Sequence, residues 1–544
     1  MDAVSFPPVP VNEPVRSYAP GSAERAALAA AVRSMSGECA ELTMAVGRRV
    51  MAGGDRFDVR APHRRDLVLG RGAQATATDV QSAVDVALAA APGWRELGFD
   101  DRAAVFLRAA ELIAGPWRDR LNAATMLGQS KTCYQAEIDA ACELVDFLRF
   151  NVAFARQVMA EQPASARGVW NRMDYRPLEG FVLAITPFNF TAIAGNLPSA
   201  PALCGNVVVW KPSPTQQLAA HYTMAAFEEA GLPPGVITMV TGDGAAVSQV
   251  ALPHRALAGI HFTGSTATFQ RLWAAVGANI DRYAAYPRLV GETGGKDFVV
   301  AHRSADPAAL VTGLVRGAFE YQGQKCSAAS RAYVPRSLWD GGVRDALVAA
   351  AESLAYGDVA DFANFGGAVI DARAFARLSG VLERLAGAGT AKVLAGGTAD
   401  DTVGWFVRPT VVECADPADE MFTREYFGPI LAVHVYEDDA WDRTLTQLEA
   451  VAPYALTGAV FARDRTALAE ADRALRFAAG NFYLNDKPTG AVVGQQPFGG
   501  ARASGTNDKA GSMWNLARWL SPRAIKETLD PPTDHRYPHM AGPA

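Results

Sequence analysis

Short apolar runs bounded by glycine, proline and asparagine recur in the middle of the chain. They cover Phe181–Ile185, Asn206–Trp210, Val236–Val240 and Gly259–Phe262, with helical patterns between them at Leu218–Ala230 and Ala267–Val276. Such runs are typical of buried parallel strands. Because strands alternate with helices, the pattern predicts an open α/β sheet that binds ligands at the carboxyl ends of its strands. A second alternating block runs from about Phe298 to Leu484.

The regions on either side of these blocks have other patterns. Ser22 is a candidate N-cap for a helix over Ala23–Ser36, which Gly37 would end. Three further helices are expected over residues 78–91, Asp101–Ile113 and Tyr134–Met159. The β-forming residues of Gly168–Tyr175 favour a hairpin arm, and the prolines of Leu529–Ala544 predict a loose tail.

Composition excludes several classes of protein. Of the 544 residues, 49 % are hydrophobic and 20 % are charged, as in soluble globular proteins, which argues against a disordered chain, a fibre or a coiled coil. The net charge of −6 argues against a broad nucleic-acid surface. No apolar run reaches the ~20 residues that cross a bilayer, so a membrane anchor is not expected.

The cysteines and histidines indicate reduced thiols and no metal site. The six cysteines form no CxxC pair, the eight histidines are scattered, and no HExxH occurs. The start of the chain has neither the apolar core of an export signal nor the Arg-rich pattern of a transit peptide. A cytoplasmic location is therefore expected.

One cysteine lies in an unusual setting. Cys326 stands among small and basic residues in Gly323–Arg331, whereas core cysteines usually have aliphatic neighbours. The adjacent Lys325 and the backbone N–H groups of a following turn would favour the thiolate, which is the nucleophilic form. The alternative is an inert, half-buried thiol.

Two polar residues suggest partners for that thiol. Glu292 follows the apolar Leu289 and Val290 and precedes two glycines, a setting that can raise the pKa of a carboxyl group and suit it to general base catalysis. Asn189 stands between aromatic residues after a predicted strand, where its amide could donate to an oxyanion. A salt-bridged or helix-capping Glu and an Asx-turn Asn are the alternatives.

Together, Asn189, Glu292 and Cys326 in this order resemble the aldehyde dehydrogenase superfamily. The resemblance covers roughly Phe57 to Glu527, and its most telling stretches are Ile185–Asn196, Phe319–Arg331 and Asn481–Lys509. It implies a Rossmann-type cofactor domain, an α/β catalytic domain and a small β oligomerisation arm. It also implies that Cys326 attacks an aldehyde, Asn189 stabilises the oxyanion, and Glu292 activates the water that hydrolyses a thioester.

The resemblance implies NAD as cofactor. Lys211 would bind the adenosine ribose, Glu425 would hold the nicotinamide ribose, and a surface ion pair is the alternative role of each. The other candidate contacts are Thr186, Ser213, Gly264, Ser265, Thr266, Ala267 and Thr268, of which those from 264 to 268 would close over the pyrophosphate. Pro214 stands where many relatives carry a ribose-binding Glu, which leaves the use of NADP open.

Within the superfamily, the resemblance implies oxidation of L-glutamate γ-semialdehyde, formed from 1-pyrroline-5-carboxylate, in proline catabolism. The loop of Thr489, Gly490 and Ala491 would anchor the α-carboxylate through backbone N–H groups, although some relatives carry Ser at position 491. The other expected pocket residues are Glu143, Phe190, Lys325, Ser327 and Phe498. For Lys325 and Glu143, an ion pair with other partners is the alternative.

The same resemblance divides the chain into three parts. We expect residues 1–160 and 181–291 to form the NAD-binding domain, 292–486 the catalytic domain, and 161–180 with 487–544 the arm and tail. A strand near Leu516–Ser521 would complete the arm, whose open edge implies a homodimer or higher homo-oligomer. The alternatives are another NAD(P)-dependent semialdehyde dehydrogenase, a cysteine hydrolase without dinucleotide, and an inactive structural relative.

Overall fold

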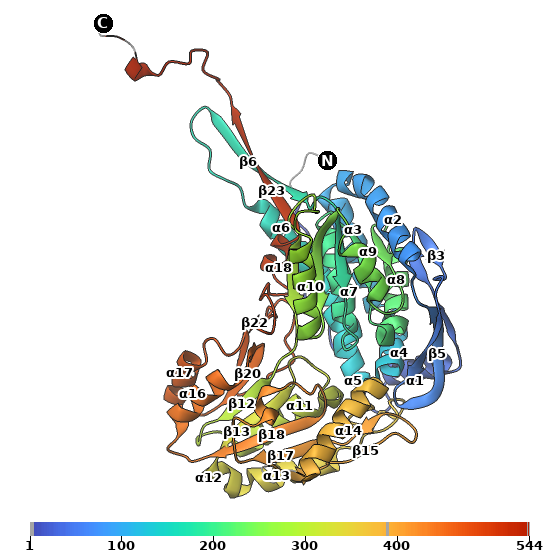
Figure 1. The fold of residues 1–544 in the computed structure, drawn as a ribbon, viewed down its shortest axis with the longest axis vertical. Helices are drawn as coiled ribbons and strands as arrows, with labels where there is room; N and C mark the ends of the chain where they lie inside the picture. The colour runs from blue at the N-terminus through green and yellow to red at the C-terminus, as the bar shows by residue number, and fades with distance from the viewer. Residues whose placement is uncertain (1–4, 388–390, 541, 543–544) are drawn as a thin grey trace.

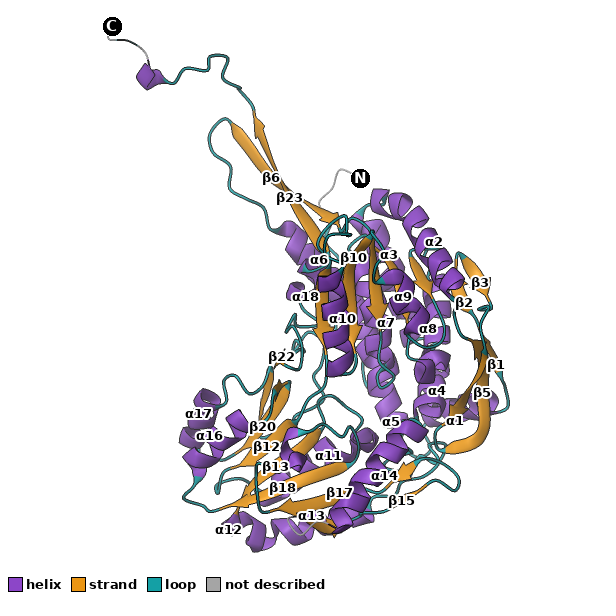
Figure 2. Cartoon of the chain, in the orientation of Figure 1, coloured by secondary structure: helices purple, strands orange, loops and turns teal. Residues whose placement is uncertain are grey.

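The computed structural model describes residues 5–387, 391–540 and 542. Two seven-stranded sheets form its two main bodies, and a thin β-ribbon projects from one of them toward the C-terminus (Figures 1 and 2). The predicted α/β class and its alternating blocks are confirmed. Among the described residues, no helix has the length and apolar character needed to cross a membrane.

The first sheet contains the predicted central strands. Its order is β11 (Arg288–Glu292), β10 (Leu257–Thr263), β7 (Phe181–Ile185), β8 (Val207–Lys211), β9 (Ile237–Met239), β2 (Met44–Val46) and β3 (Arg48–Val50). The strands from β11 to β9 are parallel. The chain runs outward from β7 through β8 to β9 and then returns to β10 on the other side of β7, which makes a topological switch point there.

Side chains of β7 alternate between two apolar layers. Phe181 and Leu183 pack into one cluster, with α2 (Ala77–Glu96), α9 (Ala245–Ala251) and α10 (Thr266–Ala278). Val182 and Ala184 pack into the other. The helices on that face are α3 (Phe99–Ala114), α4 (Arg118–Gln129), α6 (Leu144–Ala160), α7 (Thr191–Leu203) and α8 (Gln217–Glu229). Burial on both faces explains why these strands are continuously apolar.

The second sheet has the order β14 (Ala391–Ala395), β17 (Thr410–Cys414), β18 (Ile430–Tyr436), β13 (Ala329–Pro335), β12 (Asp297–Ala301), β20 (Thr457–Phe461) and β21 (Asn481–Leu484). One face packs on α11 (Pro307–Phe319) and α13 (Arg344–Ser353). The other packs on α14 (Ala372–Gly387), α16 (Trp441–Val451) and α17 (Arg465–Ala474). β12 follows β11 after four residues, so the two sheets are joined beside Glu292.

The first part of the chain contains the predicted helices, with those over 78–91 and 101–113 present as α2 and α3, and several strands that the sequence did not predict. Helix α1 (Ala23–Ser36) has Ser22 as N-cap and Gly37 as C-cap, as predicted. The unpredicted strands β1 (Ala40–Leu42), β4 (Arg56–Ala61) and β5 (Arg64–Ala73) form a small third sheet. The helix expected over 134–159 exists, but it is interrupted by a π-helical segment, Glu137–Glu143, between α5 (Cys133–Ala136) and α6.

The arm consists of β6 (Val169–Pro177) paired antiparallel with β23 (Leu520–Thr528). The prediction of a strand near Leu516–Ser521 is therefore wrong in its bounds, because α18 (Met513–Ala517) occupies its beginning. Leu516 and Trp519 are anchored in the core, and the ribbon starts only beyond them. Charged residues on both faces of β23 conceal its strand pattern.

Candidate active site

Three strand ends bring Asn189, Glu292 and Cys326 together. Glu292 is the last residue of β11, Asn189 lies between β7 and α7, and Cys326 lies in the turn before β13. The Cys326 Sγ is 3.9 Å from Glu292 Oε1. The Asn189 amide Nδ2 donates to the carbonyl of Gln324 at 3.0 Å, two residues before the thiol. Asn189 and Cys326 are buried, so water around them is restricted.

The turn that presents Cys326 has an uncommon backbone. Tyr321, Gln322 and Gly323 have φ values of 50°, 54° and 64°, in the left-handed region that non-glycine residues rarely adopt. At Gly323 a Cβ atom would lie 2.3 Å from the carbonyl oxygen of Gly428, so only glycine fits. Strained backbone of this kind persists where surrounding structure holds it and is common at active sites.

Burial controls the protonation of the thiol and the carboxyl group. It raises the pKa of Glu292 to about 8, against the opposing effect of the Lys509 ammonium. Burial, followed by the Glu292 charge, raises the pKa of Cys326 well above its usual value. The expectation that Lys325 would favour the thiolate is wrong, because its ammonium pairs with Glu320 at 3.0 Å. Glu292 is thus the group placed to accept the thiol proton.

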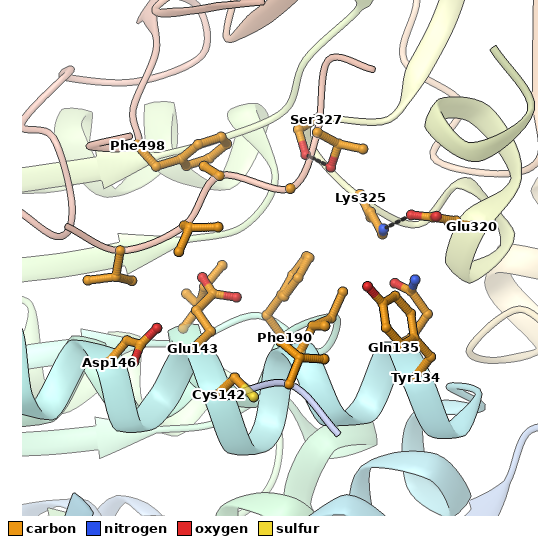
Figure 3. A pocket seen from close by; sticks show the side chains of 18 of the residues that line it. Tyr134, Gln135, Cys142, Glu143, Asp146, Phe190, Glu320, Lys325, Ser327 and Phe498 are labelled. Carbon is orange, nitrogen blue, oxygen red and sulfur yellow. Dashed lines mark hydrogen bonds and ion pairs between the residues drawn. The ribbon is translucent and has the colours of Figure 1, made fainter. Parts of the chain in front are cut away.

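A cavity of about 680 Å³ opens onto Cys326. Figure 3 shows Glu143 and Asp146 projecting into it from the helical wall, with Phe498 and Ser327 on the opposite wall. All the residues expected to bind substrate border it, namely Glu143, Phe190, Lys325, Ser327, Gly490, Ala491 and Phe498. Glu143 does not pair with Lys325, and burial raises the pKa of its carboxyl group well above the usual range.

The expected carboxylate loop forms one end of this cavity. Gly490 has a φ of 94°, a left-handed conformation that suits glycine. The Ser327 hydroxyl lies 2.8 Å from the hydroxyl of Thr489, which ties the loop to the turn of the nucleophile. Gly490, Ala491 and Ser327 therefore line the same cavity as Cys326.

The expected cofactor residues lie at the carboxyl edge of the first sheet. Thr186 follows β7 and accepts a hydrogen bond from Trp210 Nε1 at 3.0 Å, and Lys211 and Ser213 end β8 or follow it. Gly264 and Ser265 lie between β10 and α10, and Ser265 caps that helix through the Thr268 N–H. Thr266, Ala267 and Thr268 form the first turn of α10.

This edge has the features of a dinucleotide site. It includes the switch point between β7 and β10, and the N-terminus of the 13-residue α10 offers N–H groups to an anion. Burial lowers the pKa of Lys211 to about 8. Among the described residues, its ammonium has no hydrogen-bond or ion-pair partner, which leaves its donors free for ribose hydroxyls. The residues present therefore fit NAD.

Glu425 lies near the nucleophile, beside Gly295. It accepts a hydrogen bond from the Gly295 N–H at 3.0 Å, and burial raises its pKa to about 7. A Cβ at Gly294 would lie 2.1 Å from Glu425 Oε2, so this glycine permits the close approach. Glu425 and Cys326 border a common crevice, which suits a residue that holds the reacting end of a cofactor.

Sequence reasoning missed a buried ion pair beside the site. Lys131 Nζ is 2.7 Å from Asp139 Oδ2 and 4.1 Å from the centre of the Phe190 ring. Asp139 also accepts the N–H groups of Thr191 and Ala192, each at 2.9 Å, and so fixes the start of α7 directly after Asn189. Neither residue belongs to a recognisable motif, and an unusually buried Lys cannot be identified from composition.

No cluster of three or more His, Cys, Asp or Glu side chains suited to a metal ion occurs within residues 5–387, 391–540 and 542. All six cysteines are free.

Comparison with known proteins defines the class. The model of the aldehyde dehydrogenase family matches residues 50–525, and the chain belongs to this family. It is 49 % identical over 523 residues to a probable delta-1-pyrroline-5-carboxylate dehydrogenase of Schizosaccharomyces pombe, covering 95 % of each chain. It is also 49 % identical to the mitochondrial delta-1-pyrroline-5-carboxylate dehydrogenase of Bos taurus, covering 97 % of this chain and 94 % of that one.

Solved structures of similar proteins support the same family assignment. The crystal structure of the Delta-pyrroline-5-carboxylate dehydrogenase from Mycobacterium tuberculosis bound with NAD has 60 % sequence identity and a TM-score of 0.97, with both chains covered completely. A 1-pyrroline-5-carboxylate dehydrogenase from Thermus with bound NAD has 30 % identity and a TM-score of 0.89, covering 97 % of this chain and all of that one.

Proposed function

We propose that this protein oxidises L-glutamate γ-semialdehyde, the open form of 1-pyrroline-5-carboxylate, to L-glutamate with NAD as oxidant. This places it in proline catabolism. The observation that carries the proposal is the cavity that joins the Cys326 thiol, which lies 3.9 Å from the Glu292 carboxyl group, to the loop of residues 489–491. The names of the relatives point to the same substrate.

The first half of the reaction is carried by the thiol. Glu292 accepts the proton of Cys326, and the resulting thiolate adds to the aldehyde carbon, so that a C–S bond forms and the carbonyl oxygen becomes an oxyanion. The Asn189 amide and the Cys326 backbone N–H donate to this oxyanion. Removing one such donor typically costs ~3 kcal/mol of transition-state stabilisation.

NAD held at the edge of the first sheet would supply the two-electron oxidant that takes the hydride from the adduct carbon. Lys211 is suited to hold the adenosine ribose, and Glu425 the nicotinamide ribose. The α10 N-terminus at residues 264–268 is suited to hold the pyrophosphate. Glu292 releases the thiol proton to solvent and is ionised again, and it then removes a proton from the water that attacks the thioester left on Cys326. The products are the γ-carboxylate of glutamate and the free thiol.

The substrate contacts follow from the lining of the cavity. The Gly490 and Ala491 N–H groups and the Ser327 hydroxyl would receive the α-carboxylate. Phe190 and Phe498 border the path of the aliphatic chain. The lost hydroxyl at Ala491 weakens this site without removing its backbone donors.

The domain division, assembly and location are part of the same proposal. Residues 1–160 and 181–291 would hold NAD, 292–486 would supply the nucleophile, and 161–180 with 487–544 would form the arm and tail. An isolated two-stranded ribbon is marginal in water, and Trp170 on this one is 54 % exposed. These features support a homodimer or higher homo-oligomer, and the free cysteines support a reducing compartment such as the cytoplasm.

The test is NADH absorbance with purified protein and 1-pyrroline-5-carboxylate. We expect kcat/KM for this substrate to exceed that for succinic semialdehyde, which lacks the α-amino acid head. Equal or reversed preference would favour another semialdehyde dehydrogenase. A parallel assay with NADP measures the selectivity that Pro214 leaves open.

A further inference from the structure

An N-terminal segment of the chain forms part of the wall of the substrate cavity. Asn12, Glu13 and Val15 border the cavity, although they are more than 100 residues from its other lining residues. We call residues 12–16 the N-terminal strap and residues 489–496 the substrate loop. The proposed mechanism gives the strap no role.

The strap is fixed to the helical wall of the cavity. The carboxylate of Asp146 accepts the Glu13 N–H at 2.7 Å and the Asn12 amide at 2.8 Å. Asp146 is buried and lies in α6, three residues after Glu143. Its side chain projects from this helix toward the same cavity (Figure 3). Further along the strap, Arg16 N–H donates to Glu137 at 2.9 Å.

A buried ionic network holds the strap as well. Glu13 pairs with Arg149 at 2.8 Å and with Arg118, whose guanidinium also donates to the Pro14 carbonyl at 2.8 Å. Arg118 is buried and pairs with Glu137 of the π-helical segment. Because so many charges fix the backbone on both sides of Pro14, the position of Asn12 is well defined.

Asn12 connects this fixed strap to the substrate loop. Its Nδ2 donates to the Val493 carbonyl at 2.8 Å, and its Oδ1 accepts from Gln495 Nε2 at 3.0 Å. Among the described residues, the hydrogen bonds that tie the loop to the rest of the protein are these two and the contact between Thr489 and Ser327. Gly490, Gly494 and Gln495 are exposed, whereas Val493 packs into the apolar core.

We propose that Asn12 is a positioning residue that holds the substrate loop in the conformation that receives the α-amino acid head of the aldehyde. The inference rests on the proposed function, because it assigns that head to Gly490 and Ala491. Asn12 acts through the loop and contributes to selection of the substrate. The thiol, the carboxyl group and the cofactor edge lie outside its contacts.

The test compares two aldehydes in four variants of the full chain. In Asn12→Ala we expect KM for glutamate semialdehyde to rise about three- to tenfold, with kcat nearly unchanged, because the lost hydrogen bonds only position the loop. Kinetics with propionaldehyde, which has no α-amino acid head, and KM for NAD should stay as in the wild type. Ser17→Ala, at the exposed residue directly after the strap, is the matched control and should resemble the wild type.

A second variant separates action through the loop from direct contact with substrate. Gln495→Ala removes the loop side of one contact, and we expect a smaller rise in KM of the same kind and less than additive effects in the double variant. The inference is overturned if Asn12→Ala leaves KM unchanged or reduces kcat/KM equally for both aldehydes. It is also overturned if Gln495→Ala has no effect. Failure of the proposed function is recognised separately, because the wild type would then show no preference for glutamate semialdehyde over propionaldehyde.

Discussion

Two clusters of ionisable groups lie beside cavity-lining residues, one next to Phe190 and the other at Cys326, and they differ in how their charges are satisfied. Lys131 and Asp139 lie 2.7 Å apart, and Asp139 also accepts two backbone N–H groups of α7. Cys326 and Glu292 are 3.9 Å apart, and among the described residues Glu292 has no other side-chain donor. Satisfied charges fix the geometry of a site, whereas a buried carboxyl group with few partners keeps a pKa that suits proton transfer.

Removing the thiol is the strongest test of the Cys326–Glu292 cluster. We expect Cys326→Ala to lower NADH formation by ~10⁴-fold or more, because no other group can form the covalent adduct. NAD binding, measured by the shift in melting temperature, should persist. Cys39→Ala, at an exposed cysteine, is the control and should be fully active. Substantial turnover by Cys326→Ala would refute the assignment of the nucleophile.

Removing the proton acceptor should separate the two halves of the reaction. In Glu292→Gln we expect hydrolysis of the thioester to slow by ~10²- to 10⁴-fold, because a general base contributes about this much. An acyl-enzyme should then accumulate and be visible by intact mass after mixing with NAD and 1-pyrroline-5-carboxylate. Normal turnover without an adduct would show that another base is at work.

Breaking the Lys131–Asp139 pair should lower the stability of the fold more than the rate of the reaction. Lys131→Met leaves Asp139 as an unpaired buried charge, which typically costs about 3–5 kcal/mol of folding free energy. We expect a clear fall in melting temperature, and a smaller fall in the double variant Lys131→Met/Asp139→Asn. Arg344→Met, which breaks an exposed pair with Asp345, should hardly change the melting temperature. A normal melting temperature in Lys131→Met would contradict a structural role for the pair.

The sequence was sufficient to predict an element where local chemistry and burial leave a periodic pattern. Strand β7 coincides with the predicted Phe181–Ile185, because burial on both faces makes it apolar throughout. Residues predicted for the site also lie together, since family motifs mark Asn189, Glu292 and Cys326 individually. Their separation and the protonation of the thiol were not accessible, because both depend on what packs around the turn at residues 321–326.

The sequence did not reveal the role of a residue that acts through contacts with distant parts of the chain. Asn12 meets Asp146, Val493 and Gln495 only in the folded chain, and nothing in its proline-rich surroundings indicates this. The same is true of Lys131, whose partner Asp139 lies in a π-helical segment that helical periodicity does not distinguish from an α-helix. The arm strand was misplaced because β23 has no buried face to produce an alternating pattern.

The pH dependence of thioester hydrolysis gives the most sensitive comparison of the Cys326–Glu292 cluster with the Lys131–Asp139 pair. Burial raises the pKa of Glu292 from its ordinary value of 4.5 to about 8, and only the ionised form can take a proton from water. Below pH 8 the ionised fraction therefore falls about tenfold per pH unit, and the rate of hydrolysis should fall with it, by about 1.4 kcal/mol of activation free energy per unit. Above pH 8 the rate should level off.

The measurement is the rate of acyl-enzyme decay between pH 6 and pH 9, followed by quenched-flow mass spectrometry after one turnover. Lys131→Gln should shift the melting temperature at every pH. It should leave the midpoint of the pH–rate profile near 8, because it changes the Lys131–Asp139 pair and not the environment of Glu292. In Glu292→Gln the limb with a midpoint near 8 should disappear. A decay rate that is flat between pH 6 and pH 8 in the wild type would show that the base is already ionised, and that burial does not set its proton affinity.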